Sequence, residues 1–192
     1  MAETCNLSGL ILAAGLSTRY GLKNKLLADF GGISVIRNVT QMALNSGLSS
    51  SIVVTGHQSQ SIAKELHNEK VRIVYNPAYA KGMGASISFG ISCFSKETDG
   101  VLIILGDMPK VASRTIRILC EAFKNNKNKD IFVPTFNGKP GNPVLFGSTH
   151  FSALRKLSGD RGGLQIIEKN LHRSKYISTS DSGILIDYDE PY

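Results

Sequence analysis

Short apolar segments alternate with helix-like segments along most of this chain, and this alternation restricts the fold more than any other feature. Each early apolar segment is a few residues long and stops at a glycine or at an Asn-Pro pair, as buried strands do. Strands separated by helices form a mostly parallel sheet covered on both faces. The predicted fold class is therefore α/β, with three α/β/α layers and a Rossmann-like sheet. The expected strands cover residues 10–14, 51–55, 71–75, 101–105, 131–134, 144–146, 175–177 and 183–186.

Apolar residues recur at helical spacing between these strands. In residues 35–44 they mark one face of a helix, which Gly47 ends. With 192 residues and no internal repeat, low-complexity segment or linker, we expect a single domain spanning residues 1–192. The expected helices cover residues 35–44, 58–66, 87–93, 116–123, 151–157 and 164–170.

Charge and cysteine content exclude several classes of protein. The net charge of +7 is moderate, and the basic residues are scattered, which disfavours a nucleic-acid platform and favours small anionic ligands. Cys5, Cys93 and Cys120 are far apart and form no C-x-x-C pair, so we expect reduced thiols and no zinc site. No basic leader and no run of about 20 apolar residues is present, which predicts a cytoplasmic protein without a membrane partner.

The loop after the first strand carries the clearest chemical signal. Gly15 can aim backbone N–H groups at an anion, while Arg19 and Lys25 add fixed positive charge. A polyphosphate cradle is the simplest interpretation, and a flexible basic surface loop is the alternative. Because the carboxyl ends of parallel strands share one sheet edge, we expect loops 14–25, 80–86 and 106–109 to converge on one nucleotide-sized site.

Two familiar phosphate-binding motifs do not fit. A P-loop requires G-x-x-x-x-G-K-[ST], whereas five residues separate Gly15 from Gly21 and Leu22 follows. A dinucleotide fingerprint requires a third glycine after Gly82-Met-Gly84, where Ile87 stands instead. The sequence therefore supports neither a P-loop kinase nor a nicotinamide dehydrogenase.

The segment from Leu12 to Lys25 resembles L-A-A-G-x-S-x-R-M-G-x-x-K, a signature of nucleotidyltransferases that make nucleoside-diphosphate conjugates. Specifically, the chain resembles the molybdenum cofactor cytidylyltransferases, whose L-G-D-M-P motif matches residues 105–109. The chain departs from the family pattern at Tyr20, at the additional Asn24 and at Asn142, which replaces a histidine. Further similar motifs lie at residues 76–90, 138–146, 159–162 and 187–191.

The resemblance implies a nucleotide-diphospho-sugar transferase type of fold and transfer of CMP from CTP to a phosphorylated pterin. Arg19, Lys25 and Asp107 are the implied catalytic residues. Mg²⁺ is the implied cofactor, with Asp107 and Asp189 as ligands and Asp187 competing for the second position. The implied nucleotide contacts are Leu12, Ala13, Ala14, Gly15, Ser17, Arg19, Lys25, Thr55, Gly82 and Ser86.

Several alternatives remain open at this point. Ala14 favours CTP, because family members that use GTP tend to carry glycine there, but GTP and a sugar or alditol phosphate stay possible substrates. A non-catalytic carrier that inserts the molybdenum cofactor into a molybdenum hydroxylase partner is another hypothesis, as is a phosphate-binding regulatory module. Asp160 and Arg161 either order an acceptor loop or form a local ion pair or turn.

Overall fold

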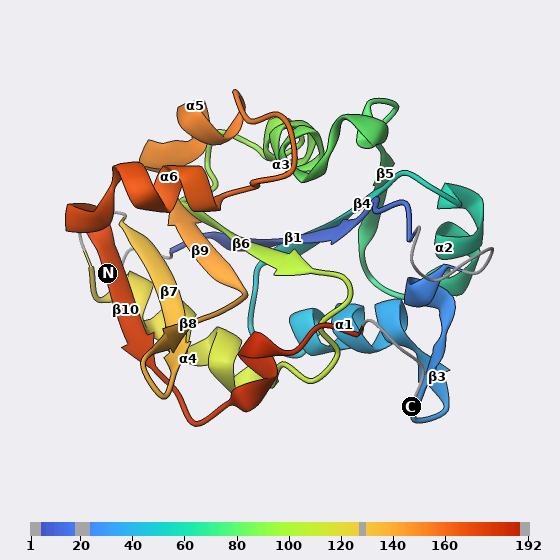
Figure 1. The fold of residues 1–192 in the computed structure, drawn as a ribbon, viewed down its shortest axis with the longest axis horizontal. Coiled ribbons are helices and arrows are strands. Elements are labelled where there is room, and N and C mark those ends of the chain that lie inside the picture. Colours follow the sequence, from blue (N-terminus) through green and yellow to red (C-terminus); the bar gives the residue numbers. More distant parts are fainter. Residues whose placement is uncertain (1–4, 18–23, 127–129, 189–192) are drawn as a thin grey trace.

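The computed structural model describes residues 5–17, 24–126 and 130–188, which form a central sheet between two layers of helices (Figure 1). The strands are β1 (Leu7–Ala13), β2 (Asp29–Phe30), β3 (Ile33–Ser34), β4 (Ser50–Thr55), β5 (Arg72–Tyr75), β6 (Gly100–Leu105), β7 (Ile131–Phe136), β8 (Lys139–Pro140), β9 (Val144–Gly147) and β10 (Ser174–Ser178). The helices are α1 (Val35–Leu44), α2 (Ser59–Glu65), α3 (Met83–Ser92), α4 (Ser113–Lys124), α5 (Phe151–Leu154) and α6 (Leu164–Lys169).

The central sheet has the strand order β10-β7-β9-β6-β1-β4-β5. β1 pairs in parallel with both β4 and β6, while β9 runs antiparallel between β6 and β7. The predicted mostly parallel, three-layer α/β fold is therefore confirmed. Because β1 and β6 are parallel neighbours, their carboxyl ends open at the same edge of the sheet.

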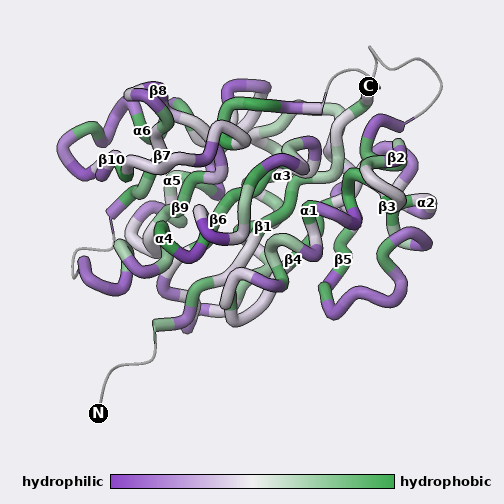
Figure 2. Tube along the Cα trace, turned by 90° about the horizontal axis from the view of Figure 1, so that it is seen from below, coloured by the Kyte–Doolittle hydropathy of each residue, from purple (hydrophilic) through white to green (hydrophobic). Residues whose placement is uncertain are grey.

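The alternation of side chains along β1 divides the core between the two layers. Ile11 packs with α1, α2 and α4 on one face, whereas Leu10 packs with α3, α5 and α6 on the other. Both side chains are fully buried, which stabilises the fold by about 1.5–3 kcal/mol each. Figure 2 shows hydrophobic residues concentrated along the central strands and hydrophilic residues on the outer turns.

One predicted strand is wrong. Residues 183–186 do not extend the sheet, because residues 182–185 form a 3₁₀ helix. The Asp181 carboxylate accepts hydrogen bonds from the Gly183 amide at 2.9 Å and from the Ala112 amide at 2.9 Å. A Cβ atom on Gly183 would lie 2.1 Å from the Lys110 carbonyl oxygen, so glycine permits this close approach. The segment is thus anchored beside the start of α4.

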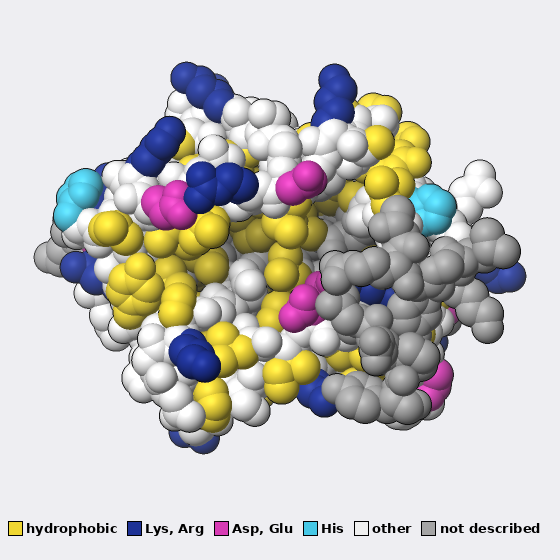
Figure 3. All heavy atoms as spheres, viewed as in Figure 1, with side chains coloured by type: hydrophobic (Ala, Val, Ile, Leu, Met, Phe, Trp, Pro, Cys, Tyr) yellow, Lys and Arg dark blue, Asp and Glu magenta, His cyan; other side chains and the backbone are white. Residues whose placement is uncertain are grey.

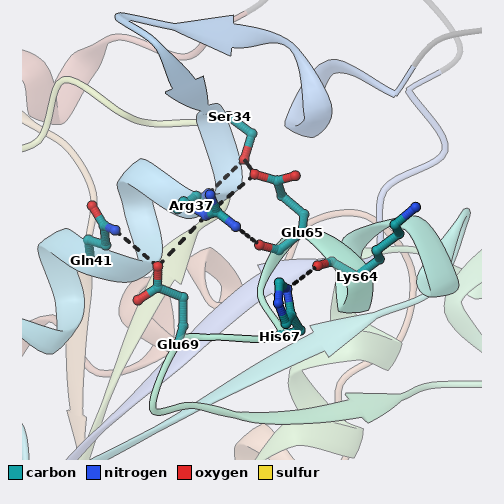
Figure 4. A network of polar contacts seen from close by, with 7 residues as sticks. All are labelled: Ser34, Arg37, Gln41, Lys64, Glu65, His67 and Glu69. Carbon is teal, nitrogen blue, oxygen red and sulfur yellow. Dashed lines mark hydrogen bonds and ion pairs between the residues drawn. The ribbon is translucent and has the colours of Figure 1, made fainter.

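A polar network links α1 to α2 and to the residues that follow it (Figure 4). Arg37 on α1 donates to the Glu65 carbonyl oxygen, and its Nε lies 3.4 Å from the Glu65 carboxylate. Ser34 caps α1 by accepting from the Arg37 amide at 3.2 Å and donates to Glu65 at 3.0 Å. The turn formed by residues 25–27 packs against both helices, with Leu26 buried in the core.

Among the helices described, none is long and apolar enough to cross a bilayer.

Candidate active site

A cavity of about 510 Å³ opens at the carboxyl ends of β1 and β6, where the described parts of the three loops meet. We call it the loop cavity. Its position follows from the sheet topology, because β1 and β6 pair in parallel. The lining residues are Leu12, Ala14, Gly15, Leu16, Ser17, Lys25, Leu26, Tyr79, Ala80, Gly82, Met83, Ser86, Leu105, Asp107, Asp160 and Asp187.

The loop after β1 presents backbone donors to this cavity. Gly15 is exposed, and a Cβ atom there would meet nothing within 4 Å. Within the described part of the chain, the amides of Gly15, Leu16 and Ser17 donate no hydrogen bond. The Ser17 hydroxyl donates to the Asn24 side-chain oxygen at 3.2 Å, which ties this segment to the start of the Lys25 turn. Open amides beside a cation form an environment suited to an anion.

Lys25 and Asp107 form an ion pair in the loop cavity, with 2.5 Å between Nζ and Oδ2. Both side chains are mostly buried. The Gly106 amide donates to the Leu12 carbonyl oxygen at 2.9 Å and so holds the end of β6 against β1. A Cβ atom on Gly106 would lie 2.5 Å from that same oxygen, so only glycine allows this approach. Asp107 therefore projects from a fixed strand end.

A second carboxylate, that of Asp187, lines the same cavity. The next residue, Tyr188, is buried and donates its amide to the Asp107 carbonyl oxygen at 2.7 Å. Its ring packs edge-on against Phe30 at a centroid distance of 6.1 Å. The chain near its end is thereby fixed beside Asp107. Arg19 and Asp189, two predicted site residues, lie outside the described residues.

Gly82 lines the loop cavity, and both Gly82 and Gly84 allow a neighbouring segment to pack closely. The Gly84 amide donates to the Gly159 carbonyl oxygen at 2.7 Å. A Cβ atom on Gly82 would lie 2.4 Å from the Asp160 carboxylate, and one on Gly84 would lie 2.8 Å from the Ser158 backbone. These contacts bring residues 158–160 onto the start of α3. That helix begins at Met83, within the predicted 80–86 loop.

Two predicted nucleotide contacts, Ala13 and Thr55, are not among the lining residues. Ala13 packs in the core on the α1 side of the sheet. Thr55 is fully buried, and its hydroxyl donates to the Val74 carbonyl oxygen at 3.1 Å. Predicted residues that do line the cavity are Leu12, Ala14, Gly15, Ser17, Lys25, Gly82, Ser86 and Asp107.

Tyr79 is a lining residue that sequence reasoning missed. A Cβ atom on Gly56 would lie 2.4 Å from both Cβ and Cγ of Tyr79 and 2.9 Å from the Ala14 carbonyl oxygen. The glycine at the end of β4 thus lets this aromatic side chain approach β1. An aromatic residue closely following Asn76-Pro77 was the available signal, but nothing local indicated its direction.

An apolar cavity of about 290 Å³ adjoins the loop cavity and shares Met83, Leu105 and Asp160 with it. Figure 3 shows this face of the molecule hollowed, with hydrophobic side chains along the hollow and acidic side chains at its borders. The apolar side chains that line the second cavity come from α3, β6, β7, β9 and α6 and include Met83, Ile87, Ile103, Leu105, Val133, Val144, Phe146, Leu164 and Ile167.

The oxygen ligands in the loop cavity fit a magnesium ion. The described residues contain no group of three His, Cys, Asp or Glu side chains that could enclose a metal. Mg²⁺, however, is commonly held by one or two carboxylates together with water and substrate phosphates. Asp107 and Asp187 supply that number of carboxylates beside the proposed phosphate loop.

Comparison with known proteins identifies the family of this domain. Residues 9–174 match the family model of the MobA-like NTP transferase domain. The chain is 30% identical to the purine catabolism protein PucB of Bacillus subtilis, over 96% of this chain and 92% of that protein. It is 26% identical to the molybdenum cofactor cytidylyltransferase of Escherichia coli, over 95% and 90% of the two chains. It is also 23% identical to the nicotine blue oxidoreductase of Paenarthrobacter nicotinovorans, over 95% and 91%.

Solved structures have the same fold. A nucleotidyl transferase from Methanothermobacter thermautotrophicus superposes with a TM-score of 0.81 at 24% identity, over 95% of this chain and 91% of that one. A Mycobacterium tuberculosis protein solved in complex with manganese superposes with a TM-score of 0.78 at 22% identity, over 91% and 88%. The central sheet and its helical layers therefore correspond to the nucleotide-diphospho-sugar transferase fold.

Proposed function

Because the chain belongs to the MobA-like NTP transferase family, we propose that it transfers CMP from CTP to a phosphorylated pterin, the molybdenum cofactor, and releases pyrophosphate. Membership of this family supports nucleotidyl transfer as the type of reaction. The similarity to a molybdenum cofactor cytidylyltransferase supports the choice of substrates. The observation that carries the proposal is the meeting of open loop amides, Lys25 and Asp107 in one cavity.

The reaction needs charge neutralisation and alignment rather than a protein nucleophile. An oxygen of the acceptor phosphate forms a new bond to the α-phosphorus of CTP. The bond between that phosphorus and the oxygen bridging to the β-phosphorus breaks, and the electron pair leaves with pyrophosphate. The acceptor phosphate already carries the nucleophilic oxygen, so no Ser–His pair is required.

The chain's own residues then have separate tasks. The amides of residues 15–17 and the ammonium of Lys25 bind the β- and γ-phosphates and stabilise the departing pyrophosphate, with Arg19 as a further cation. Asp107, with Asp189 or its competitor Asp187, would hold Mg²⁺. The ion, when bound, neutralises phosphate charge and orients the reacting groups. Lys25 would exchange its ion pair with Asp107 for contacts with the phosphates, which would leave the Asp107 carboxylate available to Mg²⁺.

The base is assigned to the part of the cavity between Ala14 and Gly82, next to Leu12 and Ser86. Ala14 directly follows β1 and lines the cavity, so its methyl group takes up space that the base could otherwise occupy. The Ser86 hydroxyl accepts a hydrogen bond from the side-chain amide of Asn76 at 3.2 Å, which fixes the orientation of the Ser86 side chain. A smaller pyrimidine is favoured over a purine in this space, which supports CTP.

A pyrophosphate-release assay with each of the four nucleoside triphosphates, molybdopterin and Mg²⁺ tests the proposal. We expect release with CTP to exceed release with GTP. Ala14→Gly should raise the GTP to CTP ratio of kcat/KM by roughly tenfold, because one methyl group in a binding pocket changes discrimination by about that factor. Equal release with both nucleotides in the wild type contradicts the cytidylyl assignment.

The same assay separates the enzyme from a carrier. A non-catalytic carrier for a molybdenum hydroxylase partner would bind molybdopterin and release no pyrophosphate with any triphosphate.

The described cysteines, Cys5, Cys93 and Cys120, form no disulfide, which suits the reducing cytoplasm in which we place the reaction.

A further inference from the structure

Asn24 stands directly before Lys25, at a position where the chain departs from the family pattern. Its side chain is buried, with 3% of the residue exposed, and it is not among the residues lining either cavity. The mechanism proposed above therefore gives Asn24 no contact with a substrate. Its hydrogen bonds nevertheless reach two residues that line the loop cavity, Ser17 and Leu26.

A single acceptor atom, Oδ1 of Asn24, joins these two segments. It accepts a hydrogen bond from the Ser17 hydroxyl at 3.2 Å and another from the Leu26 amide at 3.0 Å. The Leu26 amide can only donate, so the oxygen end of the Asn24 side chain must face it. This second bond caps the 3₁₀ turn of residues 25–27, from which Lys25 reaches Asp107. Asn24 thus ties the loop after β1 to the turn that carries the lysine.

Ser17 has a backbone conformation that needs such an anchor. Its φ of 51° lies in the left-handed region, which a residue with a Cβ atom adopts at an energetic cost. The hydrogen bond from its hydroxyl to Asn24 offsets part of that cost. Strained residues held by neighbouring contacts are common where a protein binds a ligand. Here the contact holds the segment whose open amides face the loop cavity.

The nitrogen end of the same side chain is unsatisfied. Nδ2 of Asn24 is buried and has no hydrogen-bond partner among the described residues. A buried donor without an acceptor destabilises the folded chain. Aspartate would cap the turn equally well and would carry no such donor. It would, however, place a second negative charge beside Lys25, whose charge Asp107 already offsets.

We infer that Asn24 is a positioning residue for the triphosphate, a neutral acceptor that fixes the Ser17 loop and the Lys25 turn without opposing the charge of the phosphates. This inference rests on the proposed function, because it concerns the same phosphate site. Asn24 acts through Ser17 and Lys25 and does not touch the substrate. The unpaired Nδ2 is the disadvantage of an amide in this position, and an undiminished attraction for phosphate is its advantage.

Two substitutions at Asn24 separate geometry from charge. The probe is tripolyphosphate, whose binding is measured by calorimetry in the presence of EDTA, together with the melting temperature of each variant. Asn24→Ala removes both hydrogen bonds, so it should lower the melting temperature and raise the Kd roughly tenfold. Asn24→Asp keeps both acceptor contacts and should melt close to the wild type. Its Kd should still rise roughly fivefold, and by less in high salt.

Ser34→Ala is the matched control. Ser34 is a buried residue whose side chain caps α1, the helix against which the Lys25 turn packs, and it lines neither cavity. Its removal should lower the melting temperature and leave the Kd for tripolyphosphate unchanged. Loss of stability near the Lys25 turn is thereby distinguished from loss of phosphate binding.

A purely structural cap would behave differently, because Asn24→Asp would then restore both the melting temperature and the affinity. That result overturns the inference, as does an unchanged Kd for Asn24→Ala or a wild type that does not bind tripolyphosphate. The probe has neither a base nor an acceptor, so its binding does not depend on transfer of CMP. If the expected pattern appears while no triphosphate releases pyrophosphate, the inference stands and the transferase proposal fails. If CTP is turned over while both Asn24 variants bind the probe like the wild type, the transferase proposal stands and the inference fails.

Discussion

Asp107→Asn should separate nucleotide binding from turnover, because it removes a charge and preserves the shape of the side chain. In the structure the Asp107 carboxylate lies 2.5 Å from the Lys25 ammonium, so the carboxylate offsets positive charge that could otherwise attract a phosphate. A triphosphate must take Lys25 away from this partner. The carboxylate is then released for Mg²⁺, which attracts it through its own charge. The substitution should therefore lower turnover strongly and also strengthen metal-free binding of CTP.

The two effects differ in size. At an effective dielectric constant of about 20, the interaction energy between the Asp107 charge and another unit charge about 5 Å away is roughly 3 kcal/mol. The side chains of Lys25 and Asp107 are 18% and 23% exposed, so solvent reduces the effect to about 1 kcal/mol. This corresponds to roughly fivefold tighter metal-free binding. Loss of a preorganised charge at the reacting phosphate should lower kcat by about 10²–10³.

The assay compares the variant with a matched control. CTP binding is measured by calorimetry in the presence of EDTA, and pyrophosphate release is measured with Mg²⁺ and molybdopterin. Asp29→Asn removes an exposed carboxylate outside both cavities and should match the wild type in both measurements. Turnover within about threefold of the wild type, or weaker metal-free binding by Asp107→Asn, would refute the exchange of partners described here.

Three further predictions concern packing and protonation. Gly56→Ala places a Cβ atom 2.4 Å from Tyr79. The substitution should lower the free energy of unfolding, measured by urea denaturation, by about 1–3 kcal/mol and raise the KM for CTP. An unchanged free energy of unfolding and an unchanged KM would contradict the role of this contact. Burial raises the pKa of the Cys120 thiol to about 11, so iodoacetamide followed by peptide mapping should label it only after unfolding, unlike the other two cysteines. Burial, together with nearby Arg173, lowers the pKa of His150 below 6.5. As the pH falls below 6.5, this histidine therefore takes up a proton more readily in the unfolded chain than in the folded one. The melting temperature should fall with the pH in this range, which thermal unfolding can measure. His150→Asn should flatten this pH dependence.

The layers of the fold could be predicted because their causes are local. Short apolar segments that end near a glycine are typical of buried strands, and β1, β4 and β6 follow this pattern. The segment 183–186 has a similar pattern but forms a 3₁₀ helix. Its conformation depends on Asp181, which bonds to the Ala112 amide 69 residues away in the sequence. A contact of that range leaves no signal in the segment itself.

The absence of Ala13 and Thr55, two predicted nucleotide contacts, from the lining of the loop cavity has a single geometric cause. Neighbouring parallel strands place paired residues on the same face of a sheet, and Ala13 is paired with Thr55. Both side chains therefore point toward the α1 side, whereas Leu12 and Ala14 line the cavity. The prediction placed the site at these strand ends but did not determine the phase of the pleat. The sequence does not reveal this phase, because β1 is buried on both faces of the sheet and its apolar residues do not alternate with polar ones.

The glycines at the start of α3 show how one sequence signal can have two physical causes. Gly82 and Gly84 suggested a loop that contacts the nucleotide, and Gly82 does line the loop cavity. Yet both are also required by the close approach of residues 158–160, which places Asp160 on the boundary between the two cavities. The same contact therefore shapes the proposed CTP site and the apolar cavity beside it. A local motif could indicate the first role, whereas the second emerged only from the packing of a segment about 75 residues further along the chain.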